Sequence, residues 1–242
     1  MNSNNKNLII GLDVGSTTVK AVVMDKISQE VLWKDYQRHE TKQPEKVLDF
    51  LTLIETKFPD IKNRTQIFMT GSGSANISPL LNAKFVQEVN AVSLSVEKFH
   101  PDTGSVIELG GQDAKIIIWQ VDSKSGEKRK LPSMNDKCAG GTGAVIDKIC
   151  TKLQIKTADL VNVKYKGTKL HPVAGKCGVF AETDINGLQK QGVNSQELMA
   201  SLFDAIVQQN LSVLTRGNTL FPKVLLLGGP NTFIPGMKEA WV

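Results

Sequence analysis

Two short segments combine an acid or an amide with glycines and hydroxyl groups, residue types that together can bind phosphates and a magnesium ion. The first segment covers residues 11–20 and reads GLDVGSTTVK, and the second is Gly110-Gly111-Gln112-Asp113. Glycines let backbone N–H groups approach a phosphate closely, and Ser and Thr hydroxyls add further donors. The sequence therefore predicts phosphate binding at two places.

In the first segment, Asp13 ends an apolar run and is suited to hold a hydrated Mg²⁺, a hard cation that prefers oxygen ligands. The phosphate-binding residues predicted beside it are Gly15, Ser16, Thr17, Thr18 and Lys20. The segment contains neither a Walker A sequence nor G-x-G-x-x-G, so it is neither a P-loop nor a Rossmann fingerprint. Taken alone, it is equally compatible with an ordinary hairpin turn.

The second segment repeats this chemistry. Gly110 and Gly111 would bring the chain close to the phosphates, and Gln112 or Asp113 would orient a water in line with the terminal phosphate. A third loop, Gly228-Gly229, follows an apolar run at 223–227 and is expected to pack against adenosine. For that third loop, a glycine-containing turn between a strand and a helix remains the alternative.

The elements that would position these loops form a repeated pattern. Strands are predicted at 8–14, 19–25, 31–36 and 66–70, with helices from Pro44 and over 90–99. The pattern restarts about 95 positions later, with strands at 105–109, 114–119 and 130–133, helices at 141–153, 178–190 and 195–215, and a buried strand at 223–227. We therefore expect an α/β fold of two duplicated domains, 1–103 and 104–242, whose turns face each other across a nucleotide cleft.

The overall composition is that of a globular protein. The 242 residues are 40% hydrophobic, 22% charged and 6% aromatic, with a formal charge of +5, which excludes long disorder and a disulfide-dense scaffold. Three cysteines favour a reducing compartment, and the polar residues 1–6 lack the apolar core of a signal peptide. No apolar run is long enough to span a membrane, so we expect a cytoplasmic protein without a membrane partner.

Nucleic-acid binding is not favoured either. The basic residues are scattered, and the longest cluster, Lys128-Arg129-Lys130, is expected in a solvated hairpin loop.

Two further motifs make a family resemblance specific. Residues 135–143 read NDKCAGGTG and residues 176–184 read KCGVFAETD. The three glycine loops look like the phosphate-1, phosphate-2 and adenosine motifs of the actin/Hsp70/sugar-kinase superfamily. The two cysteine motifs resemble the BadF/BadG/BcrA/BcrD ATPases, which include activators (archerases) of 2-hydroxyacyl-CoA dehydratases. The resemblance runs from about residue 8 to 230 and implies two RNase H-like domains. Within the first motif, Gly140, Gly141 and Thr142 are also assigned to the nucleotide site.

The resemblance implies that Cys138 and Cys177 of each subunit share one 4Fe-4S cluster across a homodimer axis. The residues themselves are compatible with this, because both cysteines precede predicted helices, whose free N–H groups favour thiolates. Two cysteines cannot complete a four-cysteine site, so a cluster requires two chains. Two inert buried cysteines are the alternative, and zinc is less favoured because His171 is the only nearby histidine. Cys150 is expected in the core.

Some positions depart from the family pattern. Ala144 stands where activators typically carry Arg, and Ser72-Gly73-Ser74 stands where they carry an aromatic-Gly-Arg run. The adenosine loop is shorter in its polar pattern, and the chain stops at Trp241-Val242, where a helix is expected to start. The sequence is therefore expected to be truncated or the leading module of a longer polypeptide. His39 and His100 are assigned no catalytic role.

The function that the resemblance implies is ATP-driven electron transfer. With ATP or ADP, Mg²⁺ and the cluster bound, the protein would take an electron from a flavodoxin or ferredoxin. It would pass that electron to a 2-hydroxyacyl-CoA dehydratase or benzoyl-CoA reductase type enzyme, and hydrolysis would open the two subunits about the cluster. Two alternatives stay open: a sugar kinase of the same superfamily, for which no substrate module is evident, and an ATP-binding regulatory module without turnover.

Overall fold

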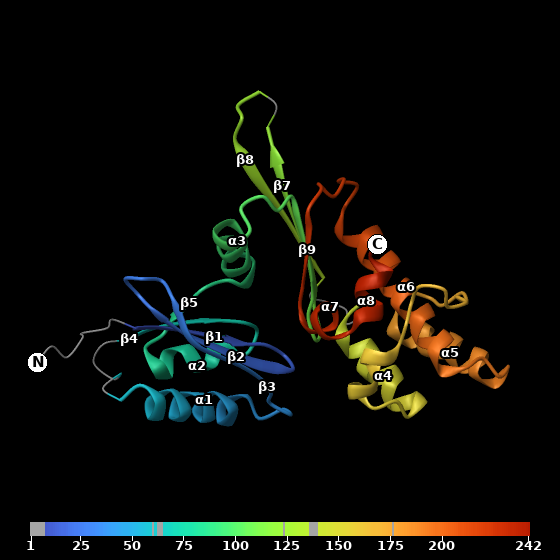
Figure 1. Ribbon diagram of the computed structural model, residues 1–242, viewed down its shortest axis with the longest axis horizontal. Coiled ribbons are helices and arrows are strands. Elements are labelled where there is room, and N and C mark those ends of the chain that lie inside the picture. Colours follow the sequence, from blue (N-terminus) through green and yellow to red (C-terminus); the bar gives the residue numbers. More distant parts are fainter. Residues whose placement is uncertain (1–7, 60, 62–64, 123, 136–139, 176) are drawn as a thin grey trace, which may run out of the picture. The chain divides into compact units, whose positions relative to one another are not determined.

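A computed structural model of the chain describes residues 8–59, 61, 65–122, 124–135, 140–175 and 177–242 (Figure 1). The chain divides into two units, residues 1–95 and 96–242. Each unit is a mixed sheet with helices, so the predicted α/β class is confirmed.

The sheet of the first unit is built on an antiparallel meander. Its strand order is β3-β2-β1-β4-β5, with β4 parallel to both β1 and β5. The strands are β1 (Leu8–Val14), β2 (Thr18–Asp25), β3 (Val31–Arg38), β4 (Thr65–Thr70) and β5 (Lys84–Phe85). Alternate residues of β1 are buried, as expected for a strand with one face on a core.

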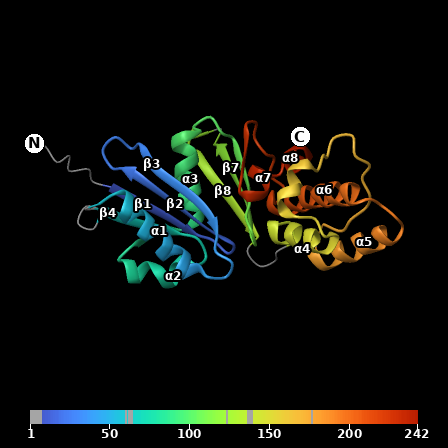
Figure 2. The ribbon, with the colours of Figure 1, turned by 60° about the horizontal axis from the view of Figure 1, so that its bottom comes forward.

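Helix α1 (Gln43–Lys57) covers one face of this sheet (Figure 2). Its buried residues are Val47, Phe50 and Ile54, which recur at helical spacing, and Pro44 lies in its first turn as predicted. Three further elements complete the region: α2 (Ser74–Ile77), the 3₁₀ turn η2 (Ser78–Leu81) and α3 (Glu88–Phe99), which runs across the division between the units.

The sheet of the second unit has the order β8-β7-β6-β9, with β9 parallel to β6. Its strands are β6 (Ser105–Leu109), β7 (Ala114–Val121), β8 (Lys128–Asn135) and β9 (Val224–Leu227). β9 is not the buried strand that the sequence predicted: Val224 is 40% exposed, because β9 pairs only with β6 in the described part of the chain.

The basic cluster is also placed differently from the prediction. Lys128, Arg129 and Lys130 begin strand β8 rather than a free loop, and Lys130 pairs with Glu97 at 3.2 Å.

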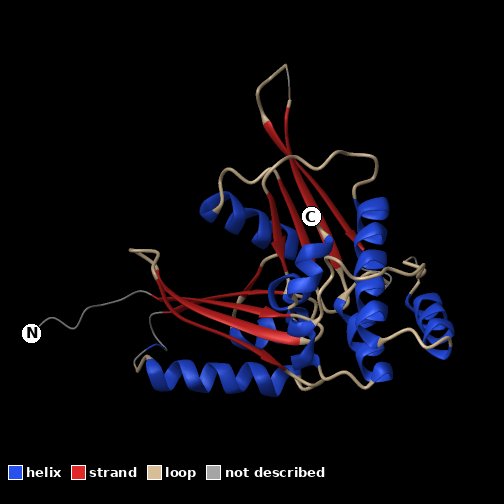
Figure 3. Cartoon of the chain, turned by 45° about the vertical axis from the view of Figure 1, so that its right-hand side comes forward, coloured by secondary structure: helices blue, strands red, loops and turns tan. Residues whose placement is uncertain are grey.

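Most helices of the second unit lie between β8 and β9 in the chain. They are α4 (Gly143–Leu153), η3 (Thr157–Asn162), α5 (Gly178–Lys190) and α6 (Ser195–Leu214), and α7 (Gly229–Phe233) and α8 (Pro235–Ala240) follow β9. The long helix α6 packs on β7, β8, α4, α5 and α8, and forms the centre of the helical layer (Figure 3). Asn194 caps α6 by accepting a hydrogen bond from the N–H of Glu197 at 3.0 Å.

The long elements thus follow the sequence prediction, whereas the short α2, α7, α8 and the 3₁₀ turns were not predicted. No helix in the described ranges is long and apolar enough to cross a membrane.

Candidate functional site

The first predicted phosphate loop is the tight turn between β1 and β2. The N–H of Gly15 donates to the carbonyl of Thr18 at 2.9 Å, which closes the turn. Asp13 and Lys20 are opposite each other in the strand register, and the Lys20 ammonium contacts Asp13 Oδ2 at 2.6 Å. Asp13 Oδ1 is buried and accepts no hydrogen bond from the described residues. A buried carboxylate oxygen with free acceptor capacity fits a magnesium-bound water.

Glycine at position 71 lets the end of β4 pass beside this aspartate. Gly71 has φ +94°, and a Cβ there would lie 2.4 Å from the carbonyl oxygen of Val14 and 2.6 Å from Asp13 Oδ1. Only glycine tolerates both the backbone conformation and the close approach.

The second predicted phosphate loop is the turn between β6 and β7. The N–H of Gly110 donates to the carbonyl of Asp113 at 2.8 Å. Lys115 is 1% exposed, and its ammonium lies 2.8 Å from Asp113 Oδ2 and 3.5 Å from Glu108 Oε1. Gln112 is exposed at the tip of the turn. This turn therefore contains a buried cation between two carboxylates.

The two turns correspond at an offset of 95 residues. Asp13 pairs with Lys20 in the first register, and Glu108 pairs with Lys115 in the second. Glu108 therefore holds the position of Asp13, while Asp113 holds that of Thr18. The sequence motif predicted a site role for Asp113 but not for Glu108. The signal was present, because the 95-residue spacing carries both members of the Asp13–Lys20 pair onto an acid and a lysine.

The start of α4 packs against the second turn. The N–H groups of Gly143 and Ala144 donate to the carbonyls of Gly110 and Gly111 at 3.0 and 2.7 Å. These donors are among the four that a helix start leaves unpaired, so the turn caps the helix. The predicted site residues that lead into α4 are buried: Gly140, Gly141 and Thr142.

The predicted adenosine loop meets the same end of the second sheet. Gly228 has φ +90°, and a Cβ there would lie 1.9 Å from the carbonyl oxygen of Leu109. Gly229 begins α7, and Pro230 lies close enough for its Cγ to be 3.2 Å from a Cβ built at Gly143. The second unit thus gathers three predicted segments, 110–113, 140–142 and 228–229.

Two residues without a predicted role also hold the first turn. His39 is buried, and its Nε2 lies 3.2 Å from the carbonyl oxygen of Gly15. Gln43 donates from Nε2 to the same oxygen at 2.9 Å. His39 was predicted to lie in a polar loop, because burial of a histidine beyond the end of a strand leaves no periodic signal in the sequence.

The cysteines lie in contrasting surroundings. Cys177 is the N-cap residue of α5, half-buried, and the backbone N–H groups of Phe180 and Val179, with a smaller contribution from Lys148, lower the pKa of its thiol. Burial raises the pKa of Cys150 to about 11, and its predicted place in the core is confirmed. Cys138 lies outside the described residues. A thiol facing helix N–H groups fits a sulfur ligand of an anionic cluster.

Helix α5 is tied to α4 near this cysteine. Glu182 accepts from Lys148 and Lys152 of α4, at 2.6 and 3.1 Å. A Cβ built at Gly178 would lie 3.0 Å from a methyl group of Val145, so the two helix starts are in close contact. α4 therefore touches both the second turn and the helix that Cys177 caps.

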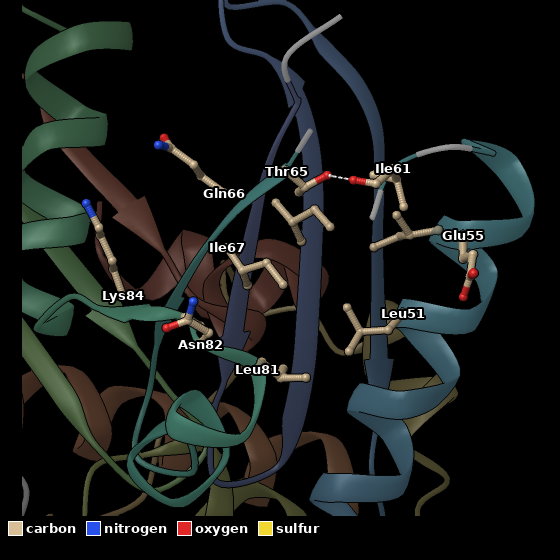
Figure 4. A pocket seen from close by; sticks show the side chains of 12 residues that line it. Leu51, Glu55, Ile61, Thr65, Gln66, Ile67, Leu81, Asn82 and Lys84 are labelled. Atoms are coloured by element: carbon tan, nitrogen blue, oxygen red, sulfur yellow. Dashed lines mark hydrogen bonds between the residues drawn. The ribbon is translucent and has the colours of Figure 1, made fainter. Parts of the chain in front are cut away.

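A separate hollow in the first unit lies away from these turns (Figure 4). Its walls are apolar side chains of α1, β4 and η2, including Leu51, Ile67 and Leu81, and Thr65 at its rim donates to the carbonyl of Ile61 at 2.6 Å. Thr65 begins β4, whereas Gly15 follows the far end of the parallel strand β1. The hollow is therefore no part of the turn for which phosphate binding is predicted.

The sequence and the fold both match known proteins. A model of the BadF/BadG/BcrA/BcrD ATPase family matches residues 10–232. The (R)-2-hydroxyglutaryl-CoA dehydratase activating ATPase of Acidaminococcus fermentans is 24% identical over 220 residues, which cover 91% of this chain and 82% of that protein.

Two solved structures are similar over nearly the whole chain. One is component A of the (R)-2-hydroxyglutaryl-CoA dehydratase of Acidaminococcus fermentans, with a TM-score of 0.82 at 25% identity, covering 97% of this chain and 87% of that chain. The other is the activator of the 2-hydroxyisocaproyl-CoA dehydratase from Clostridium difficile with bound ADPNP, with a TM-score of 0.79 at 25% identity, covering 97% and 84%. The family match spans both turns and both cysteine motifs, so the chain belongs to the BadF/BadG/BcrA/BcrD ATPase family.

Proposed function

We propose that this protein hydrolyses ATP and couples the hydrolysis to one-electron transfer toward an enzyme that processes a CoA thioester. The acceptor would be of the 2-hydroxyacyl-CoA dehydratase or benzoyl-CoA reductase type, and the donor a flavodoxin or a ferredoxin. One observation carries the proposal beyond ATP hydrolysis: in a chain of an ATPase family, Cys177 is the N-cap residue of α5, and the N–H groups of Phe180 and Val179 lower the pKa of its thiol.

The turn of the first unit would bind phosphates of the nucleotide. There, Gly15, Ser16, Thr17 and Thr18 would contact the phosphates, and Asp13 would hold Mg²⁺ through water, with Lys20 as its counter-charge. The buried Oδ1 of Asp13 supports this role, because it retains acceptor capacity for a metal-bound water.

In the second unit, Gly110 and Gly111 would contact the phosphates. Gln112 and Asp113, together with Glu108, would position the hydrolytic water, as phosphoryl transfer requires. The buried ammonium of Lys115 supports this arrangement, because it fixes both carboxylates within 3.5 Å. Gly140, Gly141 and Thr142, which lead into α4, would also bind the nucleotide, and Gly228 and Gly229 would line the adenosine pocket.

Cys138 and Cys177 would hold a 4Fe-4S cluster shared by two copies of the chain. When bound, the cluster supplies a one-electron carrier. The chain's own contribution is to hold the sulfur of Cys177 as a thiolate, through the N–H groups of Phe180 and Val179 and the charge of Lys148.

Helix α4 is the element suited to connect hydrolysis with the cysteines. Its first N–H groups bind the carbonyls of the second turn, and Lys148 and Lys152 bind Glu182 of α5. Loss of the terminal phosphate at the second turn would shift α4, and α5 would follow. A local change at the second turn would in this way move the packed helices α4 and α5.

The test is iron and acid-labile sulfide content after anaerobic purification, together with the ATPase rate. We expect about four iron atoms per two chains. The iron should be lost in Cys138→Ser and Cys177→Ser and retained in the matched control Cys150→Ser.

A protein that holds no iron even after reconstitution, but hydrolyses ATP, would overturn the electron-transfer part. Hydrolysis that needs an added sugar and yields a phosphosugar would point to a kinase instead. Nucleotide binding without phosphate release would point to a regulatory module.

A further inference from the structure

The carbonyl oxygen of Gly15 accepts hydrogen bonds from two side chains that lie outside the predicted nucleotide site. His39 Nε2 lies at 3.2 Å and Gln43 Nε2 at 2.9 Å. We propose that His39 and Gln43 are positioning residues that fix the Gly15–Ser16 peptide for phosphate binding. This inference rests on the proposed function, because it assumes that the turn binds a nucleotide.

The tautomer of His39 follows from its other contact. The N–H of Thr41 donates to His39 Nδ1 at 3.1 Å, so Nδ1 is an acceptor and carries no proton. In the neutral ring the proton is then on Nε2, which donates to Gly15. The backbone N–H of His39 also donates to the carbonyl of Thr17 at 3.3 Å. His39 therefore holds the turn at two points.

Fixing this carbonyl determines the direction of the next N–H group. No peptide bond in the described part of the chain is cis, and in a planar trans peptide the C=O and the following N–H point in opposite directions. The Gly15 carbonyl points toward His39 and Gln43, so the N–H of Ser16 points away from them. The N–H groups of Ser16 and Thr17 donate to no group in the part of the chain that the structure describes.

The N–H of Ser16, free and held in a fixed direction, suits an anionic ligand, and the free N–H of Thr17 lies next to it in the chain. A donor that is already oriented loses less conformational freedom on binding, and this gain is expressed as affinity. The contact is also tightly packed, since a Cβ built at Gly73 would lie 2.9 Å from both Cδ and Nε2 of Gln43. Gln43 therefore has little room to release the carbonyl.

The first experiment measures the dissociation constants of MgADP and MgATP and the ATPase kinetics for two variants of His39. In His39→Gln, Nε2 is four bonds from Cα, as in histidine, and keeps the donor to Gly15. In His39→Asn, Oδ1 replaces Nδ1 as the acceptor for Thr41, but the donor to Gly15 is lost. We expect His39→Asn to weaken both nucleotides about five- to tenfold and to raise KM with kcat within about twofold. His39→Gln should remain within about twofold of wild type.

The second experiment uses the fact that two donors share one oxygen. Gln43→Leu alone leaves His39 in place and should weaken binding only about threefold. The double variant His39→Asn/Gln43→Leu frees the peptide and should weaken binding by more than the product of the single effects. His100→Asn is the matched control, because this exposed histidine follows α3 and has no hydrogen bond to the turn of residues 15–18.

The outcomes separate the two proposals. If His39→Asn binds normally and His39→Gln does not, the histidine serves the Thr41 contact, and the positioning role is wrong. Folded single and double variants with unchanged dissociation constants also overturn it. A wild-type chain that binds neither nucleotide overturns the proposed function, and the positioning role with it.

Discussion

The turns of the two units share one backbone design but are fastened by different chemistry. Each turn is closed by a glycine N–H that donates to the carbonyl three residues later, at 2.9 Å in the first and 2.8 Å in the second. In the first unit the carbonyl of that glycine is held by the side chains of His39 and Gln43. In the second it is held by the N–H of Gly143.

In both units, residues that hold this carbonyl follow the third strand in the chain. Gln43 is the first residue of α1, and Gly143 is the first residue of α4. A hydrogen bond from a side chain depends on the identity of that residue. A hydrogen bond from a backbone N–H depends only on where the helix begins. Both turns are therefore bonded to the first residue of a helix, through a side chain in the first unit and through the backbone in the second.

The largest expected effect comes from adding a side chain at the glycine that follows the parallel strand in each unit. Gly71 and Gly228 follow the parallel strands β4 and β9, and both have positive φ. We expect Gly228→Ala to lose more than about 4 kcal/mol of unfolding free energy and Gly71→Ala about 2–4 kcal/mol. The reason is that the new Cβ would lie 1.9 Å from a carbonyl oxygen in the second unit and 2.4 Å in the first.

Urea unfolding would measure both losses. Gly187→Ala is the control, because a Cβ at that helical position meets nothing within 4 Å. Equal losses at positions 71 and 228 would contradict the difference in packing.

The next largest difference is expected in the stability lost when the lysine opposite Asp13 or Glu108 is replaced. Lys115 has a side chain only 2% exposed and contacts Asp113 and Glu108, whereas the Lys20 side chain is 39% exposed. Removing a buried partner leaves uncompensated carboxylates, so Lys115→Met should cost about 3 kcal/mol. Lys20→Met should cost less than about 1 kcal/mol, because the pair is only partly buried and water screens it. Thermal and urea unfolding would measure both losses, and a larger loss in Lys20→Met than in Lys115→Met would contradict this expectation.

The backbone hydrogen bonds between α4 and the second turn can be tested with one proline. Ala144→Pro removes the N–H that donates to Gly111, while the first turn of a helix accommodates proline. We expect a loss of about 1 kcal/mol of unfolding free energy and weaker nucleotide binding. Ala144→Ser keeps the N–H and should match wild type in both measurements, so a serine variant as weak as the proline variant would assign the effect to the side chain.

The sequence predicted the long elements because their periodic apolar residues are visible without the fold. β1 (Leu8–Val14) and α5 (Gly178–Lys190) begin and end at the predicted residues. The five-residue α7 and the edge position of β9 were not predictable in this way, because they depend on neighbours distant in the chain. The role of Glu108 could have been predicted, because it lies 95 residues after Asp13, at the spacing of the two repeats.

The support for the first turn was not within reach of the sequence. His39 and Gln43 meet Gly15 across 24 and 28 residues, and neither lies in a motif. Their role appears only when the connection between β3 and α1 folds back on the turn. Local patterns indicate which residues contact a phosphate, but the residues that orient them come from tertiary packing.

The smallest expected effect concerns the starts of α4 and α5. The first N–H groups of α4 are used by the second turn, whereas those of Val179 and Phe180 face the thiol of Cys177 and, with Lys148, lower its pKa. The thiolate is the reactive form, so in iron-free protein iodoacetamide should label Cys177 at a lower pH than an ordinary thiol. Cys150, buried and with a pKa of about 11, should stay unlabelled until the protein unfolds.

Labelling rates across pH, read by peptide mass spectrometry, would test this difference. In Lys148→Met the labelling midpoint of Cys177 should rise slightly and remain below that of a free thiol, because the N–H groups contribute more than the lysine. A midpoint at the ordinary thiol value in wild type would mean that the α5 N–H groups do not stabilise the thiolate. The proposed difference between the two helix starts would then be wrong.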